Sequence, residues 1–132
     1  MAEVNTDKLH EFVGQMLGDL GGAASIALVR IGDALGLYKA LHAKGPMTAA
    51  ELAAATGTHE RYVREWLSAQ AAGGFVTYDA VTGRFKLPDE QAFALAVDAS
   101  PAYLPGAYQV IASIIKDEPR ITEAFRTGIG VG

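Results

Sequence analysis

The chain has 132 residues, half of them apolar and a fifth charged, which is the composition of one globular domain with a buried core. The absence of cysteine excludes disulfides, thiol catalysis and cysteine-bound zinc, and the three histidines have no metal-ligand spacing, so we expect no metal. A net charge of −4 disfavours nucleic acids and anionic membranes as partners, and with no secretory signal a cytoplasmic protein is expected.

Two helices are predicted in the first part of the chain. The first covers residues 6–20, begins at the N-cap Thr6, and carries one apolar stripe at three- and four-residue steps. The second covers residues 23–35 and is apolar on two faces, so we expect it to be covered from both sides. Its main face comprises Ala24, Ala27, Leu28, Ile31 and Leu35, and Ile26 and Val29 lie opposite.

Glycines recur at four-residue spacing in both predicted helices, in the order Gly14, Gly18, Gly22, Gly32 and Gly36. Each glycine inside a helix costs up to about 1 kcal/mol relative to alanine. Close approach of a helix, a ligand or a second subunit would offset that cost. Alternatively, Gly21, Gly22 and Gly36 only end helices. This alternative leaves Gly14, Gly18 and Gly32 unexplained.

A winged helix-turn-helix is predicted over residues 47–87. A capping box of Thr48 and Glu51 opens a short helix that ends at Gly57, and Thr58 caps the second helix. The second helix ends at two consecutive glycines, which release the chain into a hairpin. Its expected buried stripe is Tyr62, Val63, Trp66, Leu67 and Ala71. The expected hairpin pairs Phe75, Val76 and Tyr78 with Arg84, Phe85 and Leu87.

The charge balance of this segment does not favour a DNA reader. A winged helix that binds DNA neutralises phosphates with basic side chains. The candidate phosphate contacts are Arg61, Arg64, Arg84 and Lys86. The acids of the same segment are Glu51, Glu60, Glu65 and Asp79. Since four cations face four acids, we expect this winged helix to serve packing and not DNA reading.

Residues 99–115 carry no charge and approach the lower length limit of a membrane-spanning helix. Pro101 and Pro105 remove backbone donors that lipid cannot replace, so we interpret the segment as a core or interface helix. Helical structure is expected to break and restart at residues 117–119. Ile111, Ile114 and Ile115 are expected in the core.

The same segment supplies candidates for a substrate wall. Tyr103, Tyr108 and Gln109 either pack at the core edge or face a ligand. Phe12 and Met16 are weaker candidates, because their stripe suits a helix or dimer contact better. No residue is predicted to be catalytic.

Residues 34–88, ALGLYKALHAKGPM through GRFKLP, carry a specific resemblance. The chain resembles the N-terminal winged-helix domain of class I S-adenosylmethionine-dependent methyltransferases. It is closest to the actinobacterial type often labelled transcriptional regulator, and is similar to the dimerisation domain of small-molecule O-methyltransferases. The resemblance implies a mainly α winged helix flanked by further helices, a homodimer, and a wall over the active site of a following Rossmann-like domain.

The resemblance also implies a division of the chain and of its chemistry. Residues 1–45 would form dimerising helices, 46–88 the winged helix, and 89–132 C-terminal helices and a linker. S-adenosylmethionine and a small-molecule acceptor would belong to a longer parent. The closing GIGVG follows a helical run without a preceding strand, so we expect no cofactor loop in this chain.

The preferred function is therefore a dimerising and substrate-capping module without catalysis of its own. Two alternatives remain open at this point: a DNA-binding regulator, and a protein that holds a small apolar ligand between the glycine-rich helices and the tyrosine segment.

Overall fold

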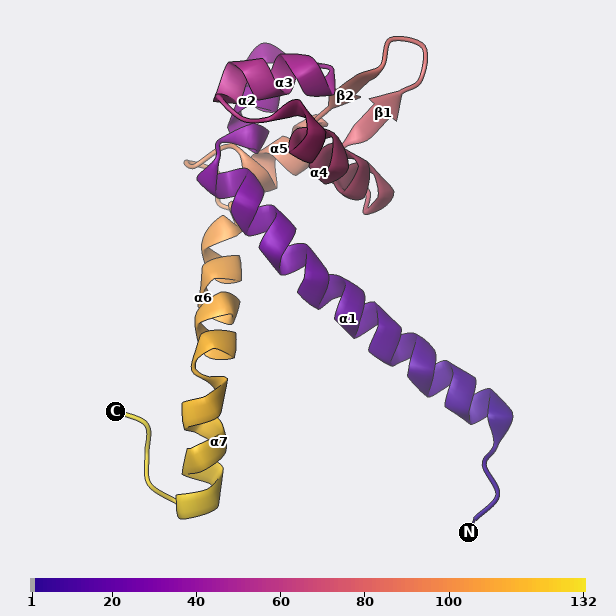
Figure 1. Cartoon of the computed structure of the whole chain (residues 1–132), viewed down its shortest axis with the longest axis vertical. Helices are drawn as coiled ribbons and strands as arrows, with labels where there is room; N and C mark the ends of the chain where they lie inside the picture. The colour runs from indigo at the N-terminus through magenta and orange to yellow at the C-terminus, as the bar shows by residue number, and fades with distance from the viewer. Residues whose placement is uncertain (1) are drawn as a thin grey trace.

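The computed structural model describes residues 2–132 and shows a winged helix-turn-helix body with two helical arms that diverge from it (Figure 1). The predicted fold class, mainly α with a small hairpin wing, is confirmed. The elements of the described residues are α1 (Thr6–Ala34), α2 (Leu37–Lys44), α3 (Ala49–Thr56), α4 (Glu60–Ala72), β1 (Thr77–Asp79), β2 (Arg84–Lys86), α5 (Asp89–Leu95), α6 (Pro105–Lys116) and α7 (Glu118–Thr127).

The first arm is a single helix of 29 residues, so the predicted break near residue 21 is wrong. Gly21 and Gly22 lie inside α1 and do not end it. Neither has the positive φ of a C-cap glycine, and each costs only about 1 kcal/mol relative to alanine. The N-cap is Asn5, one residue before the predicted Thr6. Its side-chain oxygen accepts a hydrogen bond from the amide of Lys8 at 3.1 Å.

Only the C-terminal part of α1 packs on the body, and it does so with the face opposite to the one predicted. Val29 and Gly32 are buried, whereas Ile31 and Leu35 of the predicted main face are about half exposed. Coverage from two sides is therefore not found in this chain. A helix with apolar residues on both faces does not reveal from its sequence which face its own chain will cover.

The N-terminal part of α1 extends away from the body, and every residue from 2 to 24 is exposed (Figure 1). By length and composition alone α1 is apolar enough to cross a membrane, a test that core helices of soluble proteins also pass. The exposed apolar residues form the predicted stripe and are between 41% and 63% exposed. We call them the α1 stripe: Leu9, Phe12, Val13, Met16, Leu17 and Leu20.

The core of the body is built around Trp66 and Tyr38, whose rings meet edge-on with centroids 5.0 Å apart. The indole nitrogen of Trp66 donates to the carbonyl of Leu28 at 2.8 Å, and the Tyr38 hydroxyl donates to the buried side-chain oxygen of Gln70. These bonds satisfy the polar atoms that the core encloses. The prediction that Trp66 is a core residue is confirmed.

The buried stripe of α4 differs from the prediction at Tyr62, Gln70 and Ala71, of which Ala71 is only half-buried. Tyr62 is 76% exposed, and the buried face is instead Val63, Trp66, Leu67 and Gln70. These residues follow the i, i+3, i+4, i+7 spacing of one helix face, and Tyr62 falls outside it. Gln70 was missed because its side chain is polar, although its hydrogen bond with Tyr38 makes its burial possible.

One of the two predicted helix caps is confirmed. The Thr48 hydroxyl accepts a hydrogen bond from the Glu51 amide at 3.2 Å and donates one to the Glu51 carboxylate at 3.2 Å. At the start of α4, however, the N-cap residue is His59 and no side chain caps it. The Thr58 hydroxyl instead pairs with that of Thr56 at 2.8 Å.

The wing is a two-stranded antiparallel sheet held against the start of α3. Tyr78 lies opposite Phe85. The strands are shorter than expected, so Phe75, Val76 and Leu87 of the predicted pairing lie outside them. Met47 and Phe85 exchange two backbone hydrogen bonds of 3.0 and 2.7 Å, which fix the wing to the segment before α3. Gly83 supplies the left-handed turn between the strands at φ 69°.

The second arm consists of α6 and α7, which are separated at Asp117 as the predicted break requires. Asp89 and Glu90 occupy the first turn of α5. The prediction that Ile111, Ile114 and Ile115 are core residues is wrong, because all three are about half exposed. Among the described residues the arm contacts mainly α1, and its isoleucine face is left exposed.

Candidate functional site

A group of polar side chains joins α1 to the start of the second arm. The Tyr103 hydroxyl donates to Asp33 Oδ1 at 3.0 Å. Gln109 Oε1 accepts two hydrogen bonds from the Arg30 guanidinium, at 3.1 and 2.9 Å. Two of the predicted substrate-wall residues thus contact the same stretch of α1. Gln109 also lines a groove of about 600 Å³ between α1 and α6, with Arg30, Ile31 and Asp33.

Tyr108 lies on a different side of α6 from Gln109, as the rotation of 100° per helical residue requires. It is half-buried, packs against the core, and lines a hollow of about 260 Å³ with Phe75, Leu95 and Leu104. Tyr108 and Gln109 therefore do not face a common cavity within this chain.

Phe12 and Met16 lie on the exposed part of α1, far along the chain from its contact with α6. Neither lines the groove at Gln109 or the hollow at Tyr108. The structure therefore does not bring these two residues together with Tyr103, and their role in a substrate wall stays a prediction that needs a further chain or domain.

The electrostatic environment of Tyr103 is acidic. Partial burial, with the carboxylates of Asp33 and Asp98, raises the pKa of Tyr103 to about 12. Asp98 in turn accepts a hydrogen bond from Lys39 at 3.0 Å, which lowers the pKa of its carboxyl. At neutral pH the tyrosine is thus held as a neutral donor between two carboxylates.

We expect Tyr103→Phe to lower the free energy of unfolding by about 0.5–1.5 kcal/mol, because it removes the hydrogen bond to Asp33. Urea unfolding at pH 7 measures this difference. Replacement of the exposed Tyr62 by Phe is the matched control, because its hydroxyl makes no hydrogen bond within residues 2–132. Equal effects of the two substitutions on the free energy of unfolding would contradict a stabilising hydrogen bond between Tyr103 and Asp33.

The same substitution has a pH signature. Because the folded pKa of Tyr103 lies above the unfolded value of 10, its contribution is complete below pH 10 and is lost as the pH rises towards 12. The stability difference between wild type and Tyr103→Phe should therefore shrink over that window. If the stability difference stays constant from pH 9 to 11.5, it does not arise from the raised pKa of Tyr103.

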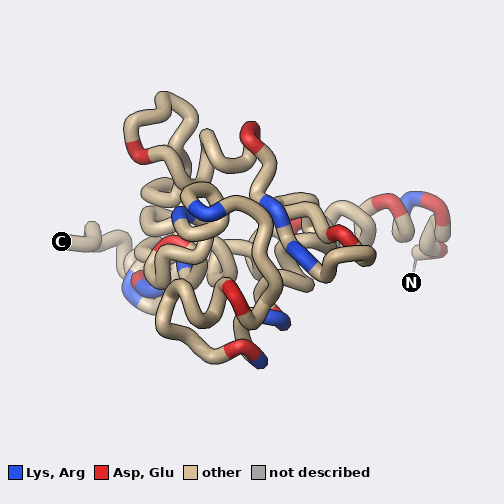
Figure 2. Tube along the Cα trace, turned by 90° about the horizontal axis from the view of Figure 1, so that it is seen from above, with Lys and Arg blue, Asp and Glu red and all other residues tan. Residues whose placement is uncertain are grey.

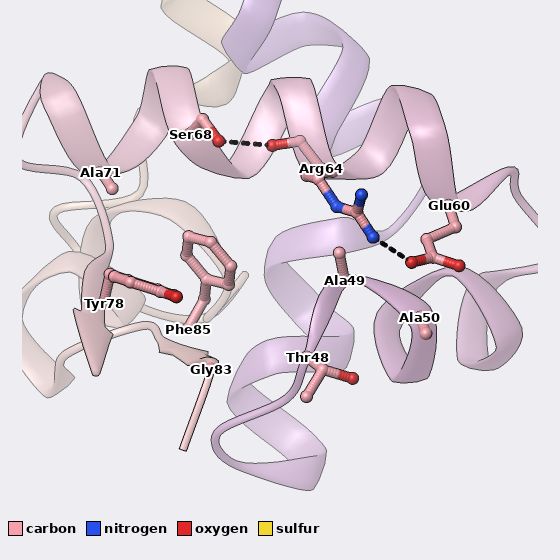
Figure 3. A pocket seen from close by; sticks show the side chains of 10 residues that line it. All are labelled: Thr48, Ala49, Ala50, Glu60, Arg64, Ser68, Ala71, Tyr78, Gly83 and Phe85. Carbon is pink, nitrogen blue, oxygen red and sulfur yellow. Dashed lines mark hydrogen bonds and ion pairs between the residues drawn. The ribbon is translucent and has the colours of Figure 1, made fainter. Parts of the chain in front are cut away.

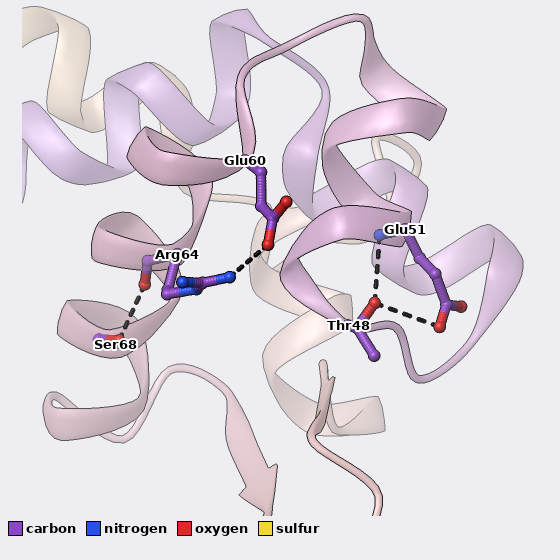
Figure 4. A network of polar contacts seen from close by, with 5 residues as sticks. All are labelled: Thr48, Glu51, Glu60, Arg64 and Ser68. Atoms are coloured by element: carbon purple, nitrogen blue, oxygen red, sulfur yellow. Dashed lines mark hydrogen bonds and ion pairs between the residues drawn. The ribbon is translucent and has the colours of Figure 1, made fainter.

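Two of the four candidate DNA contacts are paired with acids of the body. Arg64 forms an ion pair with Glu60 on α4 (Figure 4). Arg84 of the wing pairs with Glu51 of α3 at 2.9 Å. Viewed from above, basic and acidic residues alternate over the body without a continuous basic face (Figure 2). Arg61 and Lys86 are exposed.

We expect no measurable binding to mixed-sequence duplex DNA at low salt, where non-specific phosphate contacts are strongest. Two of the four cations already pair with carboxylates of the same fold. Fluorescence anisotropy of a labelled duplex tests this expectation, with a basic winged-helix protein as the positive control. Saturable binding that weakens steeply with added salt would restore the DNA-binding alternative.

A hollow between α3, α4 and the wing was not predicted from the sequence. It encloses about 470 Å³, and Arg64, Tyr78 and Phe85 are among its lining residues (Figure 3). Tyr78 lies opposite Phe85 across the hairpin, and their ring centroids are 4.7 Å apart. Whether these two rings lie beside α4 depends on how the wing folds back onto α3, and no local sequence pattern encodes that.

The described residues do not fit a nucleotide-type cofactor. The closing glycines follow α7 directly, with no strand before them and no helix after them within the chain. A cofactor loop of that kind needs both elements to position its backbone amides. No group of three or more His, Asp or Glu side chains that could hold a metal ion occurs in residues 2–132.

Comparison with protein families agrees with the observed fold. The model of the Rv2258c-like winged HTH domain matches residues 23–97, more than half of the chain. The chain belongs to this family. The matched region of this Rv2258c-like domain runs from the middle of α1 to just past α5, so it includes the whole body and excludes the second arm. No match was found among curated proteins.

Solved structures similar to the Rv2258c-like domain are methyltransferases. Mitomycin 7-O-methyltransferase MmcR is 27% identical, with a TM-score of 0.74 over 94% of this chain and 36% of that chain. CalO1, a methyltransferase of calicheamicin biosynthesis in its SAH-bound form, is 29% identical, with a TM-score of 0.69 over 96% of this chain and 37% of that chain.

A third structure is the O-methyltransferase NcsB1 from neocarzinostatin biosynthesis, in complex with S-adenosylmethionine and 2-hydroxy-5-methyl naphthoic acid. It is 25% identical, with a TM-score of 0.60 over 80% of this chain and 32% of that chain. The chain thus spans about a third of the length of the methyltransferase structures it matches. The matches to MmcR and CalO1 cover more than nine-tenths of this chain, so they include residues of both arms as well as the body.

Proposed function

We propose that this Rv2258c-like domain is the dimerising and substrate-capping module of a cytoplasmic S-adenosylmethionine-dependent methyltransferase, and that it has no catalysis of its own. Methyl transfer would occur in a domain outside these 132 residues, because the chain spans only about a third of the length of the methyltransferase structures it matches. The similarity to MmcR and CalO1 over nearly the whole chain supports this class of parent.

The observation that carries the dimerisation proposal is the α1 stripe. Its six side chains are apolar, lie on one helix face, and are exposed along the part of α1 that leaves the body. A contiguous apolar surface of this kind marks an interaction site in a soluble protein. The exposed glycines Gly14 and Gly18 lie in the same segment, and no atom of this chain would meet a Cβ there. They would allow a partner helix to approach closely.

The second arm presents a further apolar surface to the partner. Ile114, Ile115, Ile121 and Phe125 line a groove of about 450 Å³ along α6 and α7. The two arms diverge from the body (Figure 1), and we infer that a second copy covers both surfaces. An isologous dimer would bury each surface twice.

The capping role is supported by the polar group at the α1–α6 contact. Tyr103 and Gln109 are anchored on α1 by hydrogen bonds, so they are ordered before any ligand arrives. A small-molecule acceptor in the parent protein would meet this edge. Phe12, Met16 and Tyr108 do not face it within one chain, so their contact with the acceptor would need the second copy or another domain. Nucleic acid and membrane are not proposed as partners.

The test is the molar mass of the isolated chain in solution. Multi-angle light scattering should give a dimer of the 13.9 kDa chain over a tenfold dilution series. A strict monomer at the highest concentration would overturn dimerisation through these residues. Partition into neutral lipid vesicles, measured by co-sedimentation, would instead assign the α1 stripe to a membrane.

A further inference from the structure

The hollow between α3, α4 and the wing has no role in the proposed function. Its volume of about 470 Å³ lies within the range of small-molecule sites. Such sites combine apolar and aromatic walls with a few polar groups that orient the ligand. The hollow has both kinds of lining, and it lies on the body, whereas the substrate-wall candidates lie at the arms and core edge (Figure 3).

One wall is aromatic. The rings of Tyr78 and Phe85 are tilted by 41° with their centroids 4.7 Å apart. Phe85 is buried, but Tyr78 is about half exposed, so much of its ring is free to stack on a ligand. Ala49 and Ala71 also line the hollow and leave space beside the rings. A planar aromatic molecule suits this wall better than a branched aliphatic one.

The walls are held in place without a ligand. Met47 and Phe85 exchange two backbone hydrogen bonds, which tie β2 to the segment before α3. The ion pair between Arg84 and Glu51 makes a second link between wing and helix. A site whose walls are already ordered loses little conformational entropy when a ligand binds.

The polar lining is an ion pair and not a single charge. Arg64 donates to Glu60 through one Nη nitrogen, which leaves other guanidinium hydrogens and the second carboxylate oxygen available (Figure 4). A ligand at this position meets a donor and an acceptor side by side, with no net charge. A carboxylate can pair with Arg64 but is repelled by Glu60, and an amine can pair with Glu60 but is repelled by Arg64, so this partly exposed pair favours neither charge.

We propose that the hollow binds a neutral planar aromatic carboxamide. Its ring lies beside Tyr78 and Phe85, its carbonyl oxygen accepts from Arg64, and its NH₂ donates to Glu60. A carboxamide carries one acceptor and two donors on one planar group, which matches the pair in both geometry and charge. This inference does not depend on dimerisation or on methyl transfer.

The experiment is a titration of the ¹⁵N-labelled chain with cinnamamide and, separately, with cinnamate, followed by two-dimensional NMR. The two probes share a ring and a planar side arm and differ in the charge of the head group. Cinnamamide should shift the amides of Ala49, Ala50 and Gly83 in a saturable way. Cinnamate should bind about tenfold more weakly, since it loses a hydrogen bond to Glu60 and gains a repulsion.

Three variants separate the ion-pair contact from a general effect of folding. Glu60→Gln should strengthen cinnamate binding about fivefold or more and should abolish or reverse the preference for the amide. Tyr78→Ala should weaken both probes, because it removes the exposed half of the aromatic wall. Glu65→Gln makes the same charge change on α4 outside the hollow and should alter neither affinity.

The proposal is overturned if cinnamate binds wild type as well as cinnamamide does, or if Glu60→Gln and Glu65→Gln behave alike. Shifts confined to the α1–α6 groove would place any binding at the substrate wall and would equally overturn it. The absence of saturable shifts up to the solubility limit of cinnamamide would overturn it as well.

Discussion

Gly32→Ala should destabilise the domain by about 1–3 kcal/mol, although alanine is the better helix former by about 1 kcal/mol. A Cβ at this position would lie 2.5 Å from Trp66 Cζ2 and 2.6 Å from Tyr38 Cε2. Both atoms belong to buried rings that cannot move independently. The Trp66 indole is tied to the Leu28 carbonyl, and the Tyr38 hydroxyl is tied to Gln70.

Gly21→Ala is the matched control, because Gly21 lies in the same helix and a Cβ there meets no atom within 4 Å. It should be neutral or stabilising by up to about 1 kcal/mol. Urea unfolding followed by the fluorescence of Trp66 reports both variants. The free energy of unfolding of a typical domain is about 5–15 kcal/mol, so a loss of stability at Gly32 is readily measured. If both substitutions stabilise α1, the close packing at Gly32 is not real.

The Gly32 contact also shows what the glycine pattern could predict. The spacing indicated close approach at Gly14, Gly18 and Gly32, and the structure confirms it at Gly32, where two aromatic rings face the backbone. Gly36 ends the helical segment with φ 69°, as the capping alternative proposed. At Gly14 and Gly18 the contact would be intermolecular, so one chain alone does not test it.

The winged helix was predictable because local signals and packing agree there. The Thr48 cap, the glycines that end α3 and α4, and the turn glycine Gly83 each specify one element, and the buried stripe of α4 joins them around Trp66. The arms were less predictable. Apolar periodicity indicated buried faces on α1 and α6, but it did not say whether this chain or another one covers them. Ile31 and Ile111 were therefore expected to be buried, but both are about half exposed.

The candidate site was predictable only in part. Tyr103 and Gln109 were selected as polar groups in an apolar segment, and both make hydrogen bonds to α1. Their partners Asp33 and Arg30 were missed, because the sequence places them some 70 residues or more away. The hollow beside the wing was missed for the same reason. Contacts across the fold depend on the angle between elements, which neither composition nor spacing determines.

The α1 stripe should be essential for self-association, so Leu17→Glu should convert the expected dimer to monomer. Leu17 is 62% exposed and makes no contribution to the core of its own chain, and glutamate preserves helix propensity. Burying a leucine side chain is worth about 1.5–3 kcal/mol, and a two-fold dimer counts the substitution twice. The dissociation constant should therefore rise at least about 100-fold.

Sedimentation equilibrium of wild type and variant measures this change, and circular dichroism shows that α1 remains helical. Gln15→Glu adds the same charge to the same part of α1 outside the stripe and should leave the dimer intact. If both variants dissociate, net charge and not the stripe controls assembly. If neither does, the second copy lies elsewhere. Selective loss of the dimer in Leu17→Glu would identify the apolar face of α1 as the contact. This part of α1 is exposed in its own chain, so burial against a partner is the interaction that would stabilise it.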